Sequence, residues 1–177
     1  NQNSTRDAAI QLREAGKFKQ SIKLLKNLEK HFPKNVNLLT LLSHCFLLDG
    51  KLEAAKLYFD KARKIAPNSA TVGWNASIIA LIEKKTSQAL DIARYTNQRF
   101  PDDVEGMGIL GVCLRAAGEI SESITVLTQT IELNPNNAEA LINRGLIFLN
   151  KGKKTEALAD LEKGHKLKPH VEGIWDF

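Results

Sequence analysis

The apolar residues of this chain recur with a helical period, in paired runs separated by a glycine. From Ala138 to Asn150, and again from Thr155 to Leu167, apolar side chains fall three or four residues apart. This spacing is typical of one face of an amphipathic helix. Gly152 stands between the two runs and Pro169 follows the second. Glycine supplies the left-handed residue that ends a helix, and a proline soon afterwards stops it from continuing. The pattern predicts a helical hairpin.

The same pattern recurs along the whole chain. All the prolines lie 34 residues apart, at Pro33, Pro67, Pro101, Pro135 and Pro169. When Ala138 is position 1 of a 34-residue segment, positions 8 and 20 always hold Gly, Ala or Ser, and positions 11 and 24 mostly hold Leu or Phe. Small residues allow two helices to approach to about 8–10 Å, and large residues fill the space opposite them. The alternation therefore predicts closely packed helix pairs.

A 34-residue period with this order of small, large and proline positions resembles the tetratricopeptide repeat, or TPR. The resemblance divides the chain into five tandem repeats and the truncated start of a sixth, at 2–35, 36–69, 70–103, 104–137, 138–171 and 172–177. It implies an all-α fold, in which antiparallel helix pairs stack into a right-handed superhelical solenoid. Because the sixth repeat stops at Phe177, we interpret the sequence as a fragment of a larger protein.

Repeat three departs most from the pattern. Lys84 replaces the hairpin glycine at position 15, and a left-handed lysine there would cost about 1 kcal/mol. Its core positions hold small residues, namely Gly73, Ala76, Ala80 and Ala93. At the joints between repeats, Asn68, Asp102 and Asn136 directly follow a proline, and we expect their side chains to cap the next helix.

Composition and cysteine placement limit the class of protein. The chain has 43% hydrophobic and 25% charged residues, and no apolar run approaches the ~18 residues of a membrane span. Cys45 and Cys113 share position 10, two repeats apart, which separates them by roughly 20 Å. This is too far for a disulfide, so we expect both to be small core residues. These features favour a cytoplasmic location, although a leader removed before Asn1 stays an alternative.

Positive charge is concentrated in the first repeat, which carries eight Lys and Arg against three acidic residues. Six lysines crowd its second helix and flanks, namely Lys17, Lys19, Lys23, Lys26, Lys30 and Lys34. Such a face could meet nucleic acid or an acidic partner. Aromatic residues suited to base stacking are missing apart from Phe18 and Phe32, which we assign to the core. We interpret the helix as solvated and predict no nucleic-acid or membrane partner.

The sequence holds no constellation typical of a catalytic, metal or cofactor site. The histidines have no partners at metal-ligand spacing; they are His31, His44, His165 and His170. The glycines at position 15 punctuate hairpins and form no phosphate-binding loop. We therefore predict no enzyme activity, no metal and no cofactor.

The TPR resemblance implies a concave groove lined by the first helix of each repeat. Position 6 of that helix faces the groove and holds Asp7, Leu41, Asn75, Ile109 and Asn143. An amide both donates and accepts, so Asn75 and Asn143 could hold an extended peptide backbone. This is similar to a diluted form of the asparagine ladder in O-linked N-acetylglucosamine transferases. The alternative is that the two amides merely solvate the groove.

The centre of the predicted groove is unusually apolar. Beside Leu41, its floor takes residues from repeats two and three, namely His44, Leu48, Trp74, Ile78 and Ile82. Contiguous apolar surface commonly marks a partner site, and tryptophan is frequent among interface anchors. The alternative is that Trp74 turns inward over Gly73 and replaces lost core volume.

The sequence thus predicts a non-catalytic scaffold that binds a protein or an extended peptide in the groove of a TPR solenoid. The alternative is the substrate-recruiting arm of a larger, glycosyltransferase-like transferase whose catalytic domain lies beyond Phe177. A third interpretation is self-association through an apolar C-terminal end, at Trp175 and Phe177.

Overall fold

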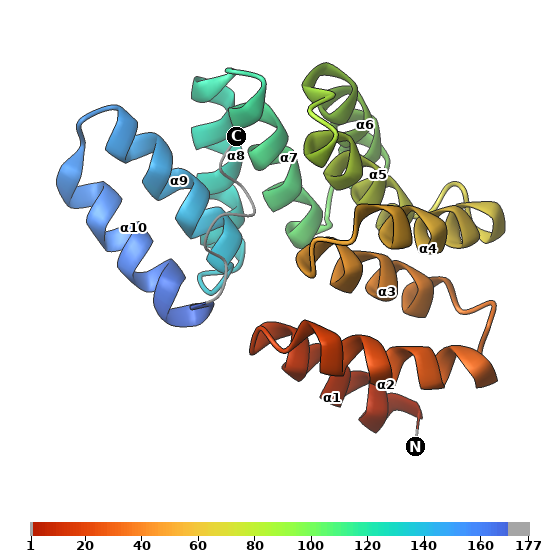
Figure 1. Cartoon of the computed structure of the whole chain (residues 1–177). Coiled ribbons are helices and arrows are strands. Elements are labelled where there is room, and N and C mark those ends of the chain that lie inside the picture. The colour runs from red at the N-terminus through yellow and green to blue at the C-terminus, as the bar shows by residue number, and fades with distance from the viewer. Residues whose placement is uncertain (1, 170–177) are drawn as a thin grey trace. The chain divides into compact units, whose positions relative to one another are not determined.

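The computed structural model describes residues 2–169, and these residues form ten helices and no strand (Figure 1). The 13-residue helices begin every 34 residues and are α1 (Gln2–Glu14), α3 (Val36–Leu48), α5 (Ala70–Ile82), α7 (Val104–Ala116) and α9 (Ala138–Asn150). The 14-residue helices keep the same interval and are α2 (Phe18–His31), α4 (Leu52–Ile65), α6 (Thr86–Arg99), α8 (Ile120–Leu133) and α10 (Lys154–Leu167). The all-α fold class is confirmed.

The helices belong to two compact units, divided between Ile79 and Ala80 within α5. In the first unit, α1 packs on α2, α2 on α3, and α3 on α4. In the second unit, α6 packs on α7, α7 on α8, α8 on α9, and α9 on α10, while α7 also contacts α9. Within each unit the helices therefore pack in chain order, and Figure 1 shows α9 and α10 as an antiparallel pair.

Each hairpin turns at one left-handed residue. Gly16, Gly50, Gly118 and Gly152 have φ angles of 71°, 71°, 81° and 74°. Lys84, at the same position of repeat three, has a φ of 59°. The predicted left-handed turn is therefore kept even where a side chain makes it costly, by about 1 kcal/mol.

The small positions bring the two helices of a hairpin into hydrogen-bonding distance. Serine hydroxyls at positions 8 or 20 donate to a backbone carbonyl of the paired helix, from Ser21 to Ala9 (2.7 Å), Ser43 to Ala55 (2.9 Å) and Ser123 to Gly111 (2.7 Å). A Cβ atom added to Gly111 would lie 2.5 Å from Cδ2 of Leu127. Leucine at position 24 thus occupies the space that the small residue leaves, as the sequence predicted.

The predicted helix caps were placed one residue too early. The Oδ1 atoms of Asn35, Asp103 and Asn137 accept from the backbone N–H three residues ahead, at 3.1, 3.1 and 2.9 Å. The predicted cap Asn136 instead lies inside a turn closed by the bond from the N–H of Asn137 to the carbonyl of Asn134, at 3.0 Å. Pro135 occupies the first central position of this turn, which proline favours, and Asn136 the second. The cap therefore falls to Asn137, which closes the turn.

Both cysteines are free and buried, which confirms their assignment as small core residues. Burial raises the pKa of the Cys113 thiol to about 12. Burial also raises the pKa of Cys45, and the Ser21 hydroxyl 3.5 Å from its Sγ opposes that rise. The neutral thiols therefore behave as apolar packing groups.

Candidate protein-binding surface

The structure divides the predicted groove residues into accessible and buried side chains. Asp7 is exposed, and Leu41, His44, Leu48, Ile82 and Ile109 are half-buried. The remaining four are buried, with exposed fractions of 4% for Trp74, 7% for Asn75, 4% for Ile78 and 0% for Asn143. The burial of Trp74 agrees with the alternative in which its indole lies within the fold. The buried four present little surface to a partner.

Helix α3 carries an accessible face that is largely apolar. Asn35 caps its N-terminus by accepting from the N–H of Leu38, and the helix has no charged residue along its 13 positions. Eight of those residues are buried. Leu41, His44 and Leu48 follow one another at intervals of three and four residues, so they share one helix face. This half-buried face, which we call the α3 face, has no charge of its own to keep it solvated.

The first helix of the chain presents a different surface. Asp7 of α1 is exposed, and its Oδ1 accepts from Arg6 at 3.4 Å. Both side chains are about half exposed, so this pair contributes little to stability. Asp7 is accessible to a partner, but its carboxylate already forms an ion pair with Arg6.

Asn143 uses both ends of its amide inside the second unit. Its Nδ2 donates to the carbonyl of Glu139 at 2.8 Å, and its Oδ1 accepts from Nε of Arg115 at 3.0 Å. The bond from Arg115 links α7 to α9. Because its side chain is 0% exposed and both amide groups are bonded within the fold, Asn143 is closed to a peptide backbone in this conformation.

Asn75 occupies the same position of repeat three and is held differently. Its Nδ2 donates to the carbonyl of Thr71 at 3.1 Å, while its Oδ1 is buried and has no hydrogen-bond partner. That oxygen is buried, so it is closed to a peptide N–H in this conformation. Neither asparagine of the predicted amide ladder is therefore accessible to a peptide backbone in this conformation.

Arg144 forms the main buried polar cluster of the second unit. Its Nε and Nη2 groups donate to Asp160 at 2.7 and 2.8 Å, and its Nη1 group donates to Thr128 at 3.1 Å. These contacts join α9 to α10 and α8. A bidentate pair of this kind fixes the helices in one register, so its role is structural.

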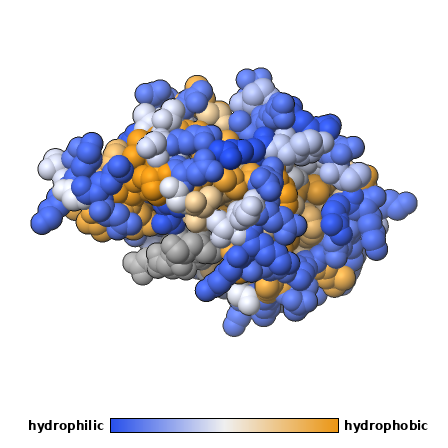
Figure 2. Space-filling view, turned by 90° about the horizontal axis from the view of Figure 1, so that it is seen from above, coloured by the Kyte–Doolittle hydropathy of each residue, from blue (hydrophilic) through white to orange (hydrophobic). Residues whose placement is uncertain are grey.

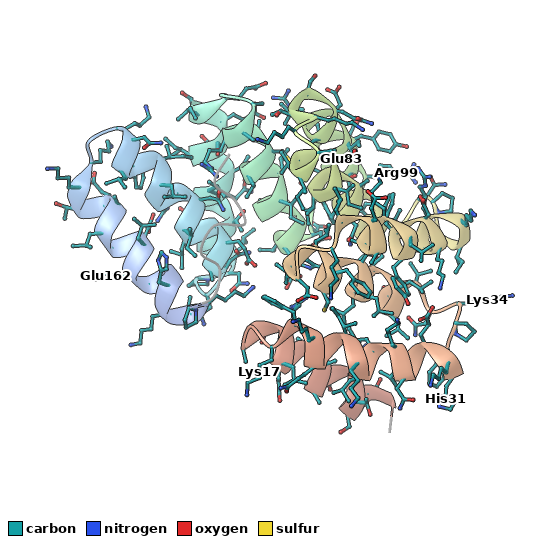
Figure 3. All side chains as sticks on the ribbon, viewed as in Figure 1. Lys17, His31, Lys34, Glu83, Arg99 and Glu162 are labelled. Atoms are coloured by element: carbon teal, nitrogen blue, oxygen red, sulfur yellow. The ribbon has the colours of Figure 1, made fainter. Side chains whose placement is uncertain are left out.

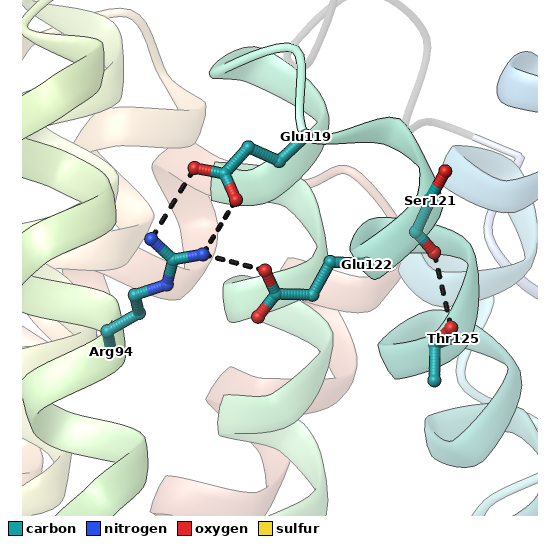
Figure 4. Close-up of polar contacts among 5 residues, drawn as sticks. All are labelled: Arg94, Glu119, Ser121, Glu122 and Thr125. Carbon is teal, nitrogen blue, oxygen red and sulfur yellow. Dashed lines mark hydrogen bonds and ion pairs between the residues drawn. The ribbon is translucent and has the colours of Figure 1, made fainter.

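A second ionic cluster lies on the surface of the same unit. Arg94 of α6 donates to Glu119 at 2.7 Å and to Glu122 at 2.7 Å, where α8 begins (Figure 4). The guanidinium lowers the pKa of Glu119. All three side chains are more than 40% exposed, so solvent screens the attraction. Figure 2 shows a surface of this mixed kind, with hydrophilic residues around separate apolar patches.

The sequence reasoning missed the two arginines that matter most for these polar groups. Neither Arg115 nor Arg144 was singled out from the sequence. The available signal for Arg115 was its place at position 12 of repeat four, directly before a repeat with an asparagine, Asn143, at position 6. Among residues 2–169, no group of three or more His, Cys, Asp and Glu side chains is placed to hold a metal ion, and no helix is suited to spanning a membrane.

Family models match most of the chain. Models of the tetratricopeptide repeat match residues 12–74 and 138–170, and a model of the TPR repeat matches residues 113–152. Together these matches cover about two thirds of the sequence. The match over residues 138–170 coincides with the fifth predicted repeat.

Solved TPR structures share the fold. A tetratricopeptide repeat protein from Parabacteroides merdae ATCC 43184 is 17% identical, with a TM-score of 0.78 over 98% of this chain and 68% of that chain. A thermophilic TPR protein of Thermus thermophilus is 18% identical, with a TM-score of 0.78 over 98% and 95%. YrrB, described as a TPR protein with an unusual peptide-binding site, is 16% identical, with a TM-score of 0.55 over 97% and 88%.

Curated relatives are longer proteins. Cellulose synthase operon protein C of Escherichia coli (strain K12) is 24% identical over 123 residues, which are 68% of this chain and 11% of that protein. The SGT1 homolog of Bos taurus is 28% identical over 88 residues, which are 50% of this chain and 26% of that protein. The chain thus spans about a tenth and a quarter of the length of these relatives. From the matched repeats and the shared fold together, the chain belongs to the tetratricopeptide repeat family.

Proposed function

We propose that this TPR module is a non-catalytic scaffold that binds an extended peptide segment of a partner protein on the α3 face. The observation that carries the proposal is the half-burial of Leu41, His44 and Leu48 on a helix without a charged residue. Apolar surface left accessible in this way is costly in water, and a partner that covers it gains the free energy of its burial.

The α3 face also indicates the chemistry of the segment. Two leucines separated by about two helical turns, with His44 between them, leave room for apolar side chains of the peptide. An extended segment presents alternate side chains to one side, so a peptide with apolar residues at alternate positions fits best. The similar fold of YrrB, described as a TPR protein with an unusual peptide-binding site, supports a peptide as the ligand class.

The proposal uses fewer residues than the sequence predicted. It leaves out Trp74, Asn75, Ile78 and Asn143, because these side chains are buried. The transferase-arm alternative stays a prediction, since no described residue favours it over a scaffold. Self-association through Trp175 and Phe177 also stays a prediction, because those residues lie outside the described part of the chain.

Selection of peptides from a random library tests the proposal. The wild-type chain should enrich peptides with apolar residues, and Leu48→Glu should weaken their binding about tenfold, because a carboxylate would be buried against them. The matched control is Leu57→Glu on α4, where the leucine is 57% exposed; it should leave the affinity unchanged. Circular dichroism would check that both variants stay helical.

Two results would reject the α3 face. The first is the absence of any enriched peptide. The second is equal affinity of the wild type and Leu48→Glu with helicity intact, which would place the peptide elsewhere on the molecule.

A further inference from the structure

One face of α2 is a row of lysines. Lys19, Lys23, Lys26 and Lys30 follow at intervals of four, three and four residues, so their side chains leave the helix within a sector of about 60°. Lys17 precedes the helix, and Lys34 follows it; Figure 3 labels both, at the two ends of α2. All six lysines are exposed. We call these six residues the α2 lysine row.

The row has no compensating negative charge. Glu29 is the single acidic residue of α2, and its two oxygens accept from Tyr58 at 3.0 Å and from Lys61 at 2.7 Å, both on α4. Within residues 2–169, none of the six lysines forms an ion pair with an acidic side chain. The exposed residues between them are uncharged, such as Gln20 and Asn27. The positive charge is therefore available to a partner.

The fold does not need this charge. Helix α2 is held by its opposite face, where Ser21, Ile22, Leu25 and Leu28 are buried. Lysines four residues apart repel one another by about 0.2–0.5 kcal/mol per pair. Lys17 and Lys19 also lie at the N-terminal end of the helix dipole, which disfavours positive charge. The row thus works against helix stability, whereas the exposed Arg94 of the second unit is matched by two glutamates (Figure 4).

We propose that the α2 lysine row docks an acidic segment of a partner protein. From Lys19 to Lys30 the row is about 16 Å long at the rise of an α-helix. About five residues of an extended segment span this length. Lysine ammonium groups are mobile point charges that tolerate variable carboxylate positions. The charge complementarity would steer such a partner and hold it in a salt-dependent manner.

Other anionic partners fit the row less well. A nucleic-acid site usually adds arginine forks and aromatic platforms, and the row contains neither. Phe18 is half-buried. Phe32 is 38% exposed, so its assignment to the core was wrong, but it lies beyond the end of the helix. A helix that binds a lipid surface inserts its apolar face, but the apolar face of α2 is already buried in the fold. An acidic protein segment needs only positive charge for binding, and the α2 lysine row supplies it.

The test uses a fluorescent peptide of ten glutamates and the full chain at low salt. The peptide should bind the wild type, and the double change Lys23→Glu and Lys26→Glu should weaken it by about tenfold or more. The matched control is Lys163→Glu with Lys166→Glu, two exposed lysines of α10, which changes the net charge by the same amount. The control variant should bind the peptide with the affinity of the wild type. Added salt should weaken the binding of the peptide to these two proteins equally.

The same titration is repeated with phosphatidylserine vesicles and with a single-stranded oligothymidine. Vesicle or oligonucleotide binding that depends on Lys23 and Lys26, with no binding of the peptide, would overturn the proposal in favour of that partner. Equal weakening by both double variants would also overturn it, because net charge alone would then explain the binding. The site is on another helix than the α3 face, so loss of either site leaves the other testable.

Discussion

Repeats three and five follow the same 34-residue pattern, yet the hydrogen bonding of their polar side chains differs. At position 6, Asn143 has both amide groups bonded, and Asn75 leaves a buried oxygen without a partner. At positions 7 and 23, α9–α10 has Arg144 and Asp160, where α5–α6 has Ala76 and Ile92. At position 15, Gly152 and Lys84 make the same left-handed turn.

The difference shows that the repeat spacing determines where the helices form. Whether a buried polar side chain finds a hydrogen-bond partner depends on the residues of the neighbouring helices. The oxygen of Asn143 is satisfied by Arg115, which belongs to the preceding repeat. The residue equivalent to Arg115 before Asn75 is Leu47, and leucine has no hydrogen-bond donor. The same asparagine is therefore a fully bonded core residue in one place and an unsatisfied one in the other.

The largest effect is expected at the Arg144–Asp160 pair. Arg144→Ala should lower the free energy of unfolding by about 3 kcal/mol, because it leaves the buried carboxylate of Asp160 unpaired. Arg144→Ala combined with Asp160→Ile copies the residues of repeat three, and it should recover most of the loss. Chemical denaturation measures both. A double variant no more stable than the single one would show that the cost lies in lost packing.

The next effect concerns the two asparagines directly. Asn143→Leu should cost about 2 kcal/mol, since it breaks two hydrogen bonds in the core, one of them from Arg115. Asn75→Leu should change stability by no more than about 0.5 kcal/mol, or raise it, because it removes an unsatisfied buried oxygen. Equal costs for the two substitutions in denaturant titrations would contradict the contrast.

A smaller effect is expected at the turns. Lys84→Gly relieves a left-handed side chain but gives the unfolded chain more freedom, so the net gain should be about 0.5 kcal/mol. The reverse change, Gly152→Lys, should cost a similar amount, since open space surrounds its added Cβ. Thermal melting of both variants checks the pair. A loss of stability in Lys84→Gly would mean that its side chain makes a contact that outweighs the strain.

A further effect, confined to alkaline pH, is expected at position 23 of repeat two, where Tyr58 stands in the place of Asp160. Burial, with the hydrogen bond and negative charge of Glu29, raises the pKa of Tyr58 from 10.0 to about 12. The neutral phenol is thus favoured in the folded state. Its contribution to stability is complete below pH 10 and is lost as the pH rises through 12. Relative to Tyr58→Phe, the wild type should lose stability between these values in alkaline denaturation series.

Sequence reasoning reached the fold because its signals are local and repeated. The glycine positions predicted left-handed turns, and even the exception at Lys84 follows the same backbone. The cap positions were wrong by one residue, since the turn after each proline depends on a backbone bond that the pattern does not encode. The candidate site was harder to predict: position 6 was expected to face a groove, but burial of Asn75 and Asn143 depends on the neighbouring side chains.

The sequence by itself determined the order of the helices and the positions of their turns, because a 34-residue period of small, large and glycine positions repeats the same local signals in each hairpin. It also placed six lysines on one segment of chain. Only the tertiary structure decided which polar groups are bonded, which apolar residues stay accessible on α3, and that Glu29 faces α4 and leaves the lysines of α2 unmatched. Those outcomes depend on side chains from other helices, whose distances no local spacing specifies.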